Sequence, residues 1–79
     1  MSYKAKWAKG SAVKIVSLSA LEQFRNTWKF HDPLQPDQLQ YAANTARVAS
    51  VGYYHGGDVL YQLEDIPGTW HECCLEPPP

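Results

Sequence analysis

His71 and Cys73 are the side chains best placed to act together chemically, because residues two apart on a β-strand point to the same side. A histidine and a cysteine in that arrangement could share a metal ion or form a nucleophile with its base. A closed zinc site needs four ligands, however, and no CxxC or HxxxH pair supplies the rest, so His55 would have to reach in from a distant turn. The sequence also offers no evident residue to orient a nucleophile. We therefore predict ordinary strand residues here, with no metal, no cofactor and no catalytic residue.

The other titratable and aromatic candidates also have structural explanations. His55 faces Asp58 across a glycine turn, where a polar pair commonly flanks the turn. Trp70, Tyr53 and Tyr54 could offer flat surfaces on which a ligand stacks. Closing a small barrel is the simpler role for these three rings.

Short strands separated by tight turns would have to position these side chains. Four runs have the composition or the alternation of strands: Ala12–Val16, Ala46–Tyr54, Val59–Asp65 and Thr69–Leu75. Two glycine-containing turns, at Gly56-Gly57 and Pro67-Gly68, separate the last three runs. Closely spaced strands of this kind are the framework of a small β-barrel.

A helix is expected between the first two strands. Ser19 and Glu22 match the capping-box pattern, in which the serine accepts from the backbone and the glutamate reaches back to it. Leu21, Phe24 and Trp28 follow at helical spacing and form one apolar stripe. Such a stripe is more typical of a face that packs on a core than of a cofactor site.

The end of this helix is set by Asp32-Pro33, because a residue before proline disfavours the helical conformation. The sequence therefore predicts a helix over Ser19–Phe30. A polar connection over Pro33–Asn44 follows, with one helical turn beginning at Pro36.

The hairpin at Gly56-Gly57 suggests that the chain needs a partner. A two-residue turn would place Gly52 opposite Tyr61 and give the sheet two apolar faces. One face would carry Val59, Tyr61 and Leu63. The other would carry Val51, Tyr53 and Leu60. The helix with Trp28 could cover one face and a second subunit the other, so we expect the second face, together with Trp28 and Trp70, to contact a ligand or a partner.

Length and charge limit the classes of function. The chain has 79 residues, which allow one domain: a flexible basic arm over 1–10, a barrel over 11–77 and a tail over 78–79. A net charge of −1 argues against a nucleic-acid binder that neutralises many phosphates. No segment is long and apolar enough to span a membrane. Cys73 and Cys74 are neighbours that would close almost no loop, and free thiols fit a reducing cytoplasm.

Charge is distributed unevenly along the chain. The start is basic, with Lys4, Lys6, Lys9 and Lys14. The end is acidic, with Glu64, Asp65, Glu72 and Glu76. The basic arm is expected to be solvated, with Trp7 as a potential anchor, or alternatively to meet the acidic edge of another subunit.

The closing segment resembles that of the C-terminal barrel of the nitrile hydratase beta subunit. That family has a W-E-x-x-L-E-P-like run, and this chain has His71-Glu72-Cys73-Cys74-Leu75-Glu76-Pro77. Glu72, Leu75, Glu76 and Pro77 match, whereas the tryptophan position is His71 and Trp70 stands one residue earlier. The resemblance implies an SH3-like barrel.

A second resemblance is to the plasmid-borne, type II dihydrofolate reductase, also a chain of this size with an SH3-like barrel. The similar stretches are Val51-Gly52-Tyr53-Tyr54, Tyr61-Gln62-Leu63-Glu64 and Pro67-Gly68. That family lines a pore between four subunits with a V-Q-I-Y strand, whereas this chain has Trp70-His71-Glu72-Cys73. The family's paired basic residues fall near Ile15 and Val16, which are apolar. We therefore expect no folate reduction.

Together these features predict a mainly β, SH3-like small barrel with one inserted α-helix at about 19–30. The chain looks like single-domain proteins carried on mobile bacterial gene cassettes. We expect a cytoplasmic, non-catalytic binding or assembly module that self-associates as a dimer or tetramer. One alternative is an accessory domain beside a larger nitrile-hydratase-type partner. The other is a small-ligand binder, or an enzyme, with its site on an oligomer axis.

Overall fold

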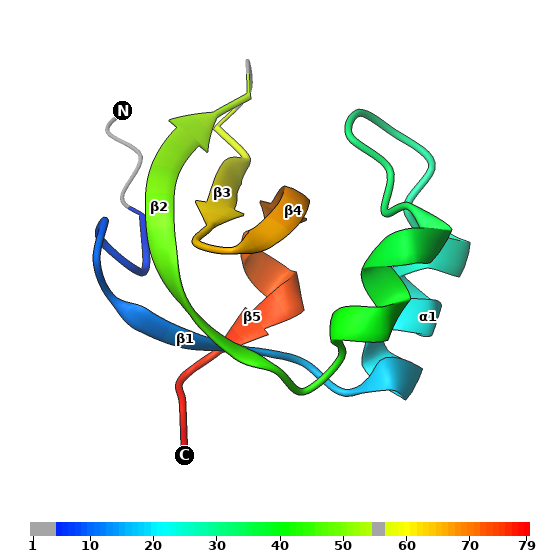
Figure 1. The fold of residues 1–79 in the computed structure, drawn as a ribbon. Coiled ribbons are helices and arrows are strands. Elements are labelled where there is room, and N and C mark those ends of the chain that lie inside the picture. The colour runs from blue at the N-terminus through cyan, green and yellow to red at the C-terminus, as the bar shows by residue number, and fades with distance from the viewer. Residues whose placement is uncertain (1–4, 55–56) are drawn as a thin grey trace.

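Five antiparallel strands form one curled sheet in the computed structural model, which describes residues 5–54 and 57–79. The strand order is β4-β3-β2-β1-β5. The strands are β1 (Ala12–Ile15), β2 (Thr45–Tyr53), β3 (Val59–Leu63), β4 (Ile66–His71) and β5 (Leu75–Glu76). The helices are α1 (Leu18–Thr27) and the 3₁₀ turns η1 (Pro36–Tyr41) and η2 (Glu72–Cys74). The predicted fold class, a mainly β, SH3-like small barrel with one inserted α-helix, is confirmed: α1 lies between β1 and β2 and stands to one side of the half-barrel (Figure 1).

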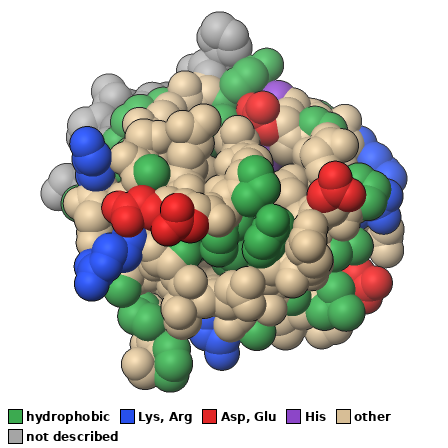
Figure 2. All heavy atoms as spheres, in the orientation of Figure 1, with side chains coloured by type: hydrophobic (Ala, Val, Ile, Leu, Met, Phe, Trp, Pro, Cys, Tyr) green, Lys and Arg blue, Asp and Glu red, His purple; other side chains and the backbone are tan. Residues whose placement is uncertain are grey.

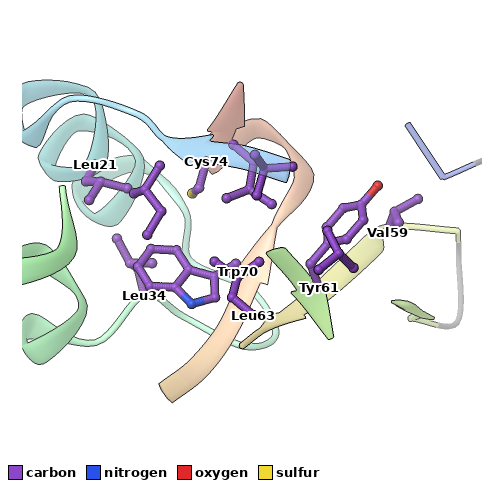
Figure 3. Packing of buried hydrophobic residues seen from close by; sticks show 11 residues of the cluster. Leu21, Leu34, Val59, Tyr61, Leu63, Trp70 and Cys74 are labelled. Carbon is purple, nitrogen blue, oxygen red and sulfur yellow. The ribbon is translucent and has the colours of Figure 1, made fainter. Parts of the chain in front are cut away.

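Alternation along the strands builds the core inside the curl. Val13 and Ile15 of β1 are fully buried, and β3 buries every second residue at Val59, Tyr61 and Leu63. Figure 3 shows Trp70 from β4 between Leu34 and the barrel strands, with Leu21 of α1 on the same side. Trp70 is 0% exposed. This ring therefore fills the barrel interior, as expected.

The N-cap of the helix lies two residues earlier than predicted. Ser17, not Ser19, is the N-cap: its backbone is extended and its Oγ accepts a hydrogen bond from the Ala20 amide at 3.3 Å. Ser19 lies inside the first turn, with its Oγ 3.2 Å from the Ser17 Oγ. The capping box predicted from Ser19 and Glu22 is therefore wrong.

The helix also ends earlier, at Thr27 rather than near Phe30. Trp28 takes an extended backbone conformation, and its amide still donates to the Phe24 carbonyl at 2.8 Å. Asp32 then has a φ of 47°, in the left-handed region that aspartate tolerates better than most residues. The helical turn expected from Pro36 is confirmed as η1.

The hairpin register differs from the predicted one by one residue. Val51 is opposite Tyr61, Tyr53 is opposite Val59 and Gly52 is opposite Leu60. Three residues separate Tyr54 from Asp58, whose carbonyl accepts from the Tyr54 amide at 2.9 Å, so the predicted two-residue turn is wrong. A shift of one residue moves side chains to the other face of a sheet. Val51 and Tyr53 therefore share the face of the core stripe, and Leu60 lies on the opposite face.

The next turn is also displaced. Leu63 pairs with Ile66, so Glu64-Asp65 connects β3 to β4, and Asp65 has a φ of 62°. Pro67-Gly68, the predicted turn, lies within β4. A Cβ on Gly68 would come 2.8 Å from the Gln38 Nε2, which donates to the Thr69 carbonyl at 3.1 Å. The glycine thus permits η1 to pack closely against β4.

The described part of the N-terminal arm is docked against the barrel. Trp7 packs edge-on against Tyr61, with ring centroids 5.8 Å apart, and its amide donates to the Tyr61 hydroxyl at 3.3 Å. The Lys6 amide donates to Glu72 at 2.9 Å. Trp7 therefore anchors this segment, as the sequence suggested. Glu72, one of the acidic residues near the end of the chain, accepts a hydrogen bond from the segment within the same molecule.

Candidate functional site

Aromatic and imidazole rings gather where α1 ends, outside the core that Trp70 closes. Trp28 is at the centre of this group. Its ring lies 5.5 Å from Phe24, 5.1 Å from Phe30, 5.3 Å from His31 and 4.9 Å from His71, centroid to centroid. We call Phe24, Trp28, Phe30, His31 and His71 the ring cluster. It joins the last turn of α1, the loop after it and the end of β4.

The early end of α1 places Trp28 in this position. The ring stacks on Phe24, four residues earlier, at an interplanar angle of 16°. The Trp28 Nε1 donates to the His31 carbonyl at 2.7 Å, which closes the loop back onto the indole. Phe30, at the tip of this loop, remains 69% exposed.

His31 connects this loop to the β2–β3 hairpin. Its Nε2 lies 2.6 Å from the Asp58 Oδ2, and its Nδ1 lies 3.2 Å from the Asp32 Oδ2. The ring stacks on Tyr54, with centroids 3.6 Å apart and planes 4° from parallel. Histidine and acidic side chains lie side by side at the upper edge of the face shown in Figure 2.

This environment favours the imidazolium form of His31. Desolvation lowers the pKa of the ring, but the hydrogen bonds to Asp58 and then to Asp32 outweigh it, so the pKa of His31 is raised above its ordinary value of 6.5. A ring with a carboxylate at each nitrogen needs a proton on both. His31 therefore acts as a cationic bridge between two loops that are distant in the sequence.

His71 is a buried polar residue, 4% exposed, in the wall of the ring cluster. Its Nε2 lies 2.9 Å from the Asp32 carbonyl oxygen, which can only accept, so Nε2 carries the hydrogen. Within residues 5–54 and 57–79, the Nδ1 has no hydrogen-bond partner, and its lone pair remains an acceptor. Backbone pairing of His71 with Leu60 fixes the residue at the end of β4.

A cleft of about 270 Å³ opens beside the ring cluster. Phe24 and Trp28 form its apolar side, and the hairpin and η2 form its polar side. The lining residues are Phe24, Trp28, Gly57, Asp58, Val59, His71, Glu72 and Cys73. Three separate segments of the chain thus meet around one small space.

Of the two cysteines, Cys73 lines this cleft and Cys74 lies in the core. Cys73 is exposed and Cys74 is fully buried. A hydrogen bond with Cys74 lowers the pKa of the Cys73 thiol to about 7, whereas the same interaction and burial raise the pKa of Cys74. The prediction that Cys73 follows His71 on one strand is wrong, because β4 ends at His71 and Cys73 lies in η2. His71 and Cys73 nonetheless both border the cleft.

The other residues singled out from the sequence lie apart from this cleft. Val51 is half-buried against the core, and Leu60 is half-buried on the opposite face. Tyr53 is 52% exposed and Trp70 is inside the core. Of the five candidate interface or ligand residues, only Trp28 therefore lines the cleft. The expected pair of His55 and Asp58 lies partly outside the described residues, and the Asp58 Oδ2 bonds His31.

His31 is the residue of the site that sequence reasoning missed. A signal was present, because Trp28, Phe30 and His31 fall within four residues at the end of the helical pattern.

Two further observations limit the kinds of site. In the part of the chain that the structure describes, His, Cys, Asp and Glu form no group of three able to hold a metal ion. No helix there is long and apolar enough to cross a membrane.

Comparison of the chain with protein-family models, with curated proteins and with solved structures finds no match. The resemblances to nitrile hydratase and to type II dihydrofolate reductase therefore stay predictions. A function for this chain has to rest on the geometry of the ring cluster and its cleft.

Proposed function

We propose that this protein is a non-catalytic binding module whose ligand site is the cleft beside Trp28. The observation that carries the proposal is the bridge made by His31, which ties the loop after α1 to the β2–β3 hairpin beside an open, aromatic-lined cleft. Recognition sites are commonly concave and mostly apolar, with a few placed polar groups. This cleft combines the apolar side chains of Phe24, Trp28 and Val59 with the polar groups of Asp58, His71 and Glu72.

The ring cluster is not needed to close the barrel. Trp70, Tyr61, Ile15 and Leu21 already fill the interior and are 0% exposed. Trp28 is only half-buried, and Phe30 is 69% exposed. Aromatic side chains that a fold leaves at its surface are candidates for contact with a partner.

Hydrogen bonds also hold residues of the cleft in place, which favours binding because less freedom is lost when a ligand enters. Trp28 is fixed by its Nε1 bond to the His31 carbonyl, and His71 by its bond to the Asp32 carbonyl. His31 itself bonds both Asp32 and Asp58. Each wall of the cleft is thus connected to the loop after α1.

NMR mapping with a small panel of neutral, cationic and anionic side-chain analogues tests this proposal. Amide shifts should concentrate at residues 24, 28, 57–59 and 71–73, whichever analogue binds. Trp28→Leu should abolish these shifts while the protein stays folded, and Leu18→Ala, at an exposed position on α1, should leave them unchanged. Shifts centred elsewhere, or none with any analogue, would contradict the proposal.

Self-association is a second proposal, and exposed aromatic side chains favour it. Phe30 and Tyr53 are 69% and 52% exposed. A short chain without a disulfide gains stability from surface buried between subunits. Its test is the oligomeric state of the protein in solution.

A further inference from the structure

We propose that the cleft beside Trp28 binds a hydrogen-bond-donating organic cation, an alkylammonium or a guanidinium group. This inference rests on the proposed binding function and specifies the ligand. Three independent features support it: the charge of the rim, the hydrogen-bonding state of His71 and the aromatic side of the cleft.

The rim is acidic. Asp58 and Glu72 both line the cleft. The Asp58 Oδ2 bonds His31, and the Glu72 Oε2 accepts from the Tyr61 hydroxyl at 2.6 Å and from the Lys6 amide at 2.9 Å. Among the described residues, the second oxygen of each carboxylate has no hydrogen-bond partner. Each carboxylate therefore keeps one acceptor for a ligand.

The nearby positive charge does not cancel the negative charge of the rim. His31 contacts the rim through Asp58, and it lies between the carboxylates of Asp58 and Asp32. Those three groups together carry one negative charge when His31 is protonated. Glu72 adds another, and Cys73, whose thiol pKa is lowered to about 7, adds part of a third near neutral pH. The cleft therefore attracts cations.

His71 gives a separate indication of what the ligand must supply. The ring is 4% exposed and borders the cleft, and its Nε2 hydrogen is used by the Asp32 carbonyl. The Nδ1 is consequently an acceptor without a partner among residues 5–54 and 57–79. The Nδ1 can therefore accept a hydrogen bond from a donor on a ligand in the cleft.

The aromatic side and the size of the cleft narrow the ligand further. Phe24 and Trp28 stack at 16° and contribute two aromatic rings to the lining. A cation against such rings gains from the ring quadrupole, most of all with tryptophan. The volume of about 270 Å³ is at the lower end of small-molecule sites, so it suits one ammonium or guanidinium group with a short alkyl stem.

Titration of the purified full chain by NMR tests the ligand class. Butylammonium and butylguanidinium should shift the amides of residues 57–59 and 71–73 and the Trp28 indole. Butyrate should not, and tetramethylammonium, which is a cation without donors, should bind at least about fivefold more weakly. A capped Gly-Lys-Gly peptide separates the two possible sources of the cation. Stronger binding of the peptide would identify a protein side chain, and stronger binding of the free amine would identify a small molecule.

Glu72→Gln and Asp58→Asn should each raise the Kd for butylammonium at least about fivefold, because each removes a charge-assisted hydrogen bond. Glu22→Gln, on the exposed surface of α1, is the matched control and should leave the Kd unchanged. If butanol or butyrate shifted the same residues as strongly as butylammonium, the ligand class would be wrong and the binding site would stand. If no probe shifted the cleft residues, both the ligand class and the proposed function would be wrong.

Discussion

Ser17 fixes the first turn of α1 through a single side-chain hydrogen bond to the Ala20 amide. Replacing an N-cap serine by alanine typically costs about 1 kcal/mol. We expect Ser17→Ala to lower the free energy of unfolding by about that amount. Ser19→Ala, in the same turn but not at the cap, should cost less than half as much. Urea unfolding of both variants measures the difference, and a larger loss for Ser19→Ala would mean that the helix begins where the sequence pattern alone placed it.

The sequence pattern selected Ser19 because a glutamate follows it at capping-box spacing. The structure selects Ser17 because of contacts that are distant in the sequence. Ile15 pairs with Leu75, and the Val16 amide donates to the Cys74 carbonyl at 3.0 Å. Pairing with β5 thus sets the end of β1, and the helix begins directly after it, with Ser17 as the N-cap. Local pattern cannot reveal that constraint.

The Tyr61 hydroxyl is the polar link between the core and the docked N-terminal arm. It donates to Glu72 at 2.6 Å and accepts from the Trp7 amide at 3.3 Å. Burial and then the Glu72 bond raise the pKa of Tyr61 to about 12. Tyr61→Phe should lower the free energy of unfolding by about 1–3 kcal/mol, because it leaves a carboxylate and an amide without this partner. Proteolysis should also cut near Trp7 faster; an unchanged stability and cleavage rate would show that the hydroxyl does not secure the arm.

At the scale of elements, the sequence predicted the existence of helices and strands more accurately than the register in which the strands pair. The helix between the first two strands, the helical turn at Pro36 and strands corresponding to β1, β2, β3 and β4 all occur. The register of the hairpin was wrong because Gly57, with a φ of 104°, belongs to a three-residue connection rather than a two-residue turn. A single extra residue exchanges the faces of a strand, so the apolar face predicted from Val51, Tyr53 and Leu60 does not exist as one surface.

The candidate site was the part least accessible from sequence. Its members come from α1, the loop after it, the hairpin and η2. His31 and Asp58 are 27 residues apart and meet only because both loops rise from the same end of the fold. No local spacing encodes that contact. Trp28 was singled out for its place on an apolar stripe, and its position at the edge of the cleft follows from the early end of α1.

The bridge between these two loops should be sensitive to pH. His31 has a raised pKa in the folded protein, so its contribution to stability is complete below the ordinary imidazole value of about 6.5 and is lost as the pH rises through the raised value. The difference in Tm between the wild type and His31→Gln should therefore be largest near pH 6 and small near pH 9. Thermal unfolding followed by circular dichroism across this range measures it. A difference that grew with increasing pH would mean that His31 is neutral in the folded state.

His71→Gln is the control for that experiment. Its Nε2 faces a carbonyl oxygen rather than a carboxylate. The same thermal unfolding measurement on this variant shows whether the pH dependence belongs to His31. A pH-dependent loss for this variant as large as that for His31→Gln would assign the titration to the ring cluster as a whole.

At the scale of the whole molecule, the question is whether one copy of the chain is a complete unit. Within the described residues, the core contains 11 buried hydrophobic or cysteine residues, and both cysteines are free. Small single cores supply little net stability. Figure 2 shows hydrophobic side chains near the middle of one face, between acidic and basic ones. Aromatic side chains are also exposed where the hairpin and the loop after α1 project from the sheet.

We therefore expect self-association through the exposed aromatic side chains at that end of the molecule, with Tyr53 as the central contact. Association and folding are linked, so a change that removes the contact should lower both the apparent mass and the stability. Tyr53→Asp should do so in sedimentation velocity runs from about 5 to about 500 µM, and its Tm should lose any dependence on protein concentration. Leu18→Asp introduces the same charge at a leucine that is 49% exposed on α1 and should leave the mass unchanged. A wild-type monomer throughout this range would contradict self-association, whereas an oligomer that Leu18→Asp disrupts and Tyr53→Asp does not would place the contact on the helix.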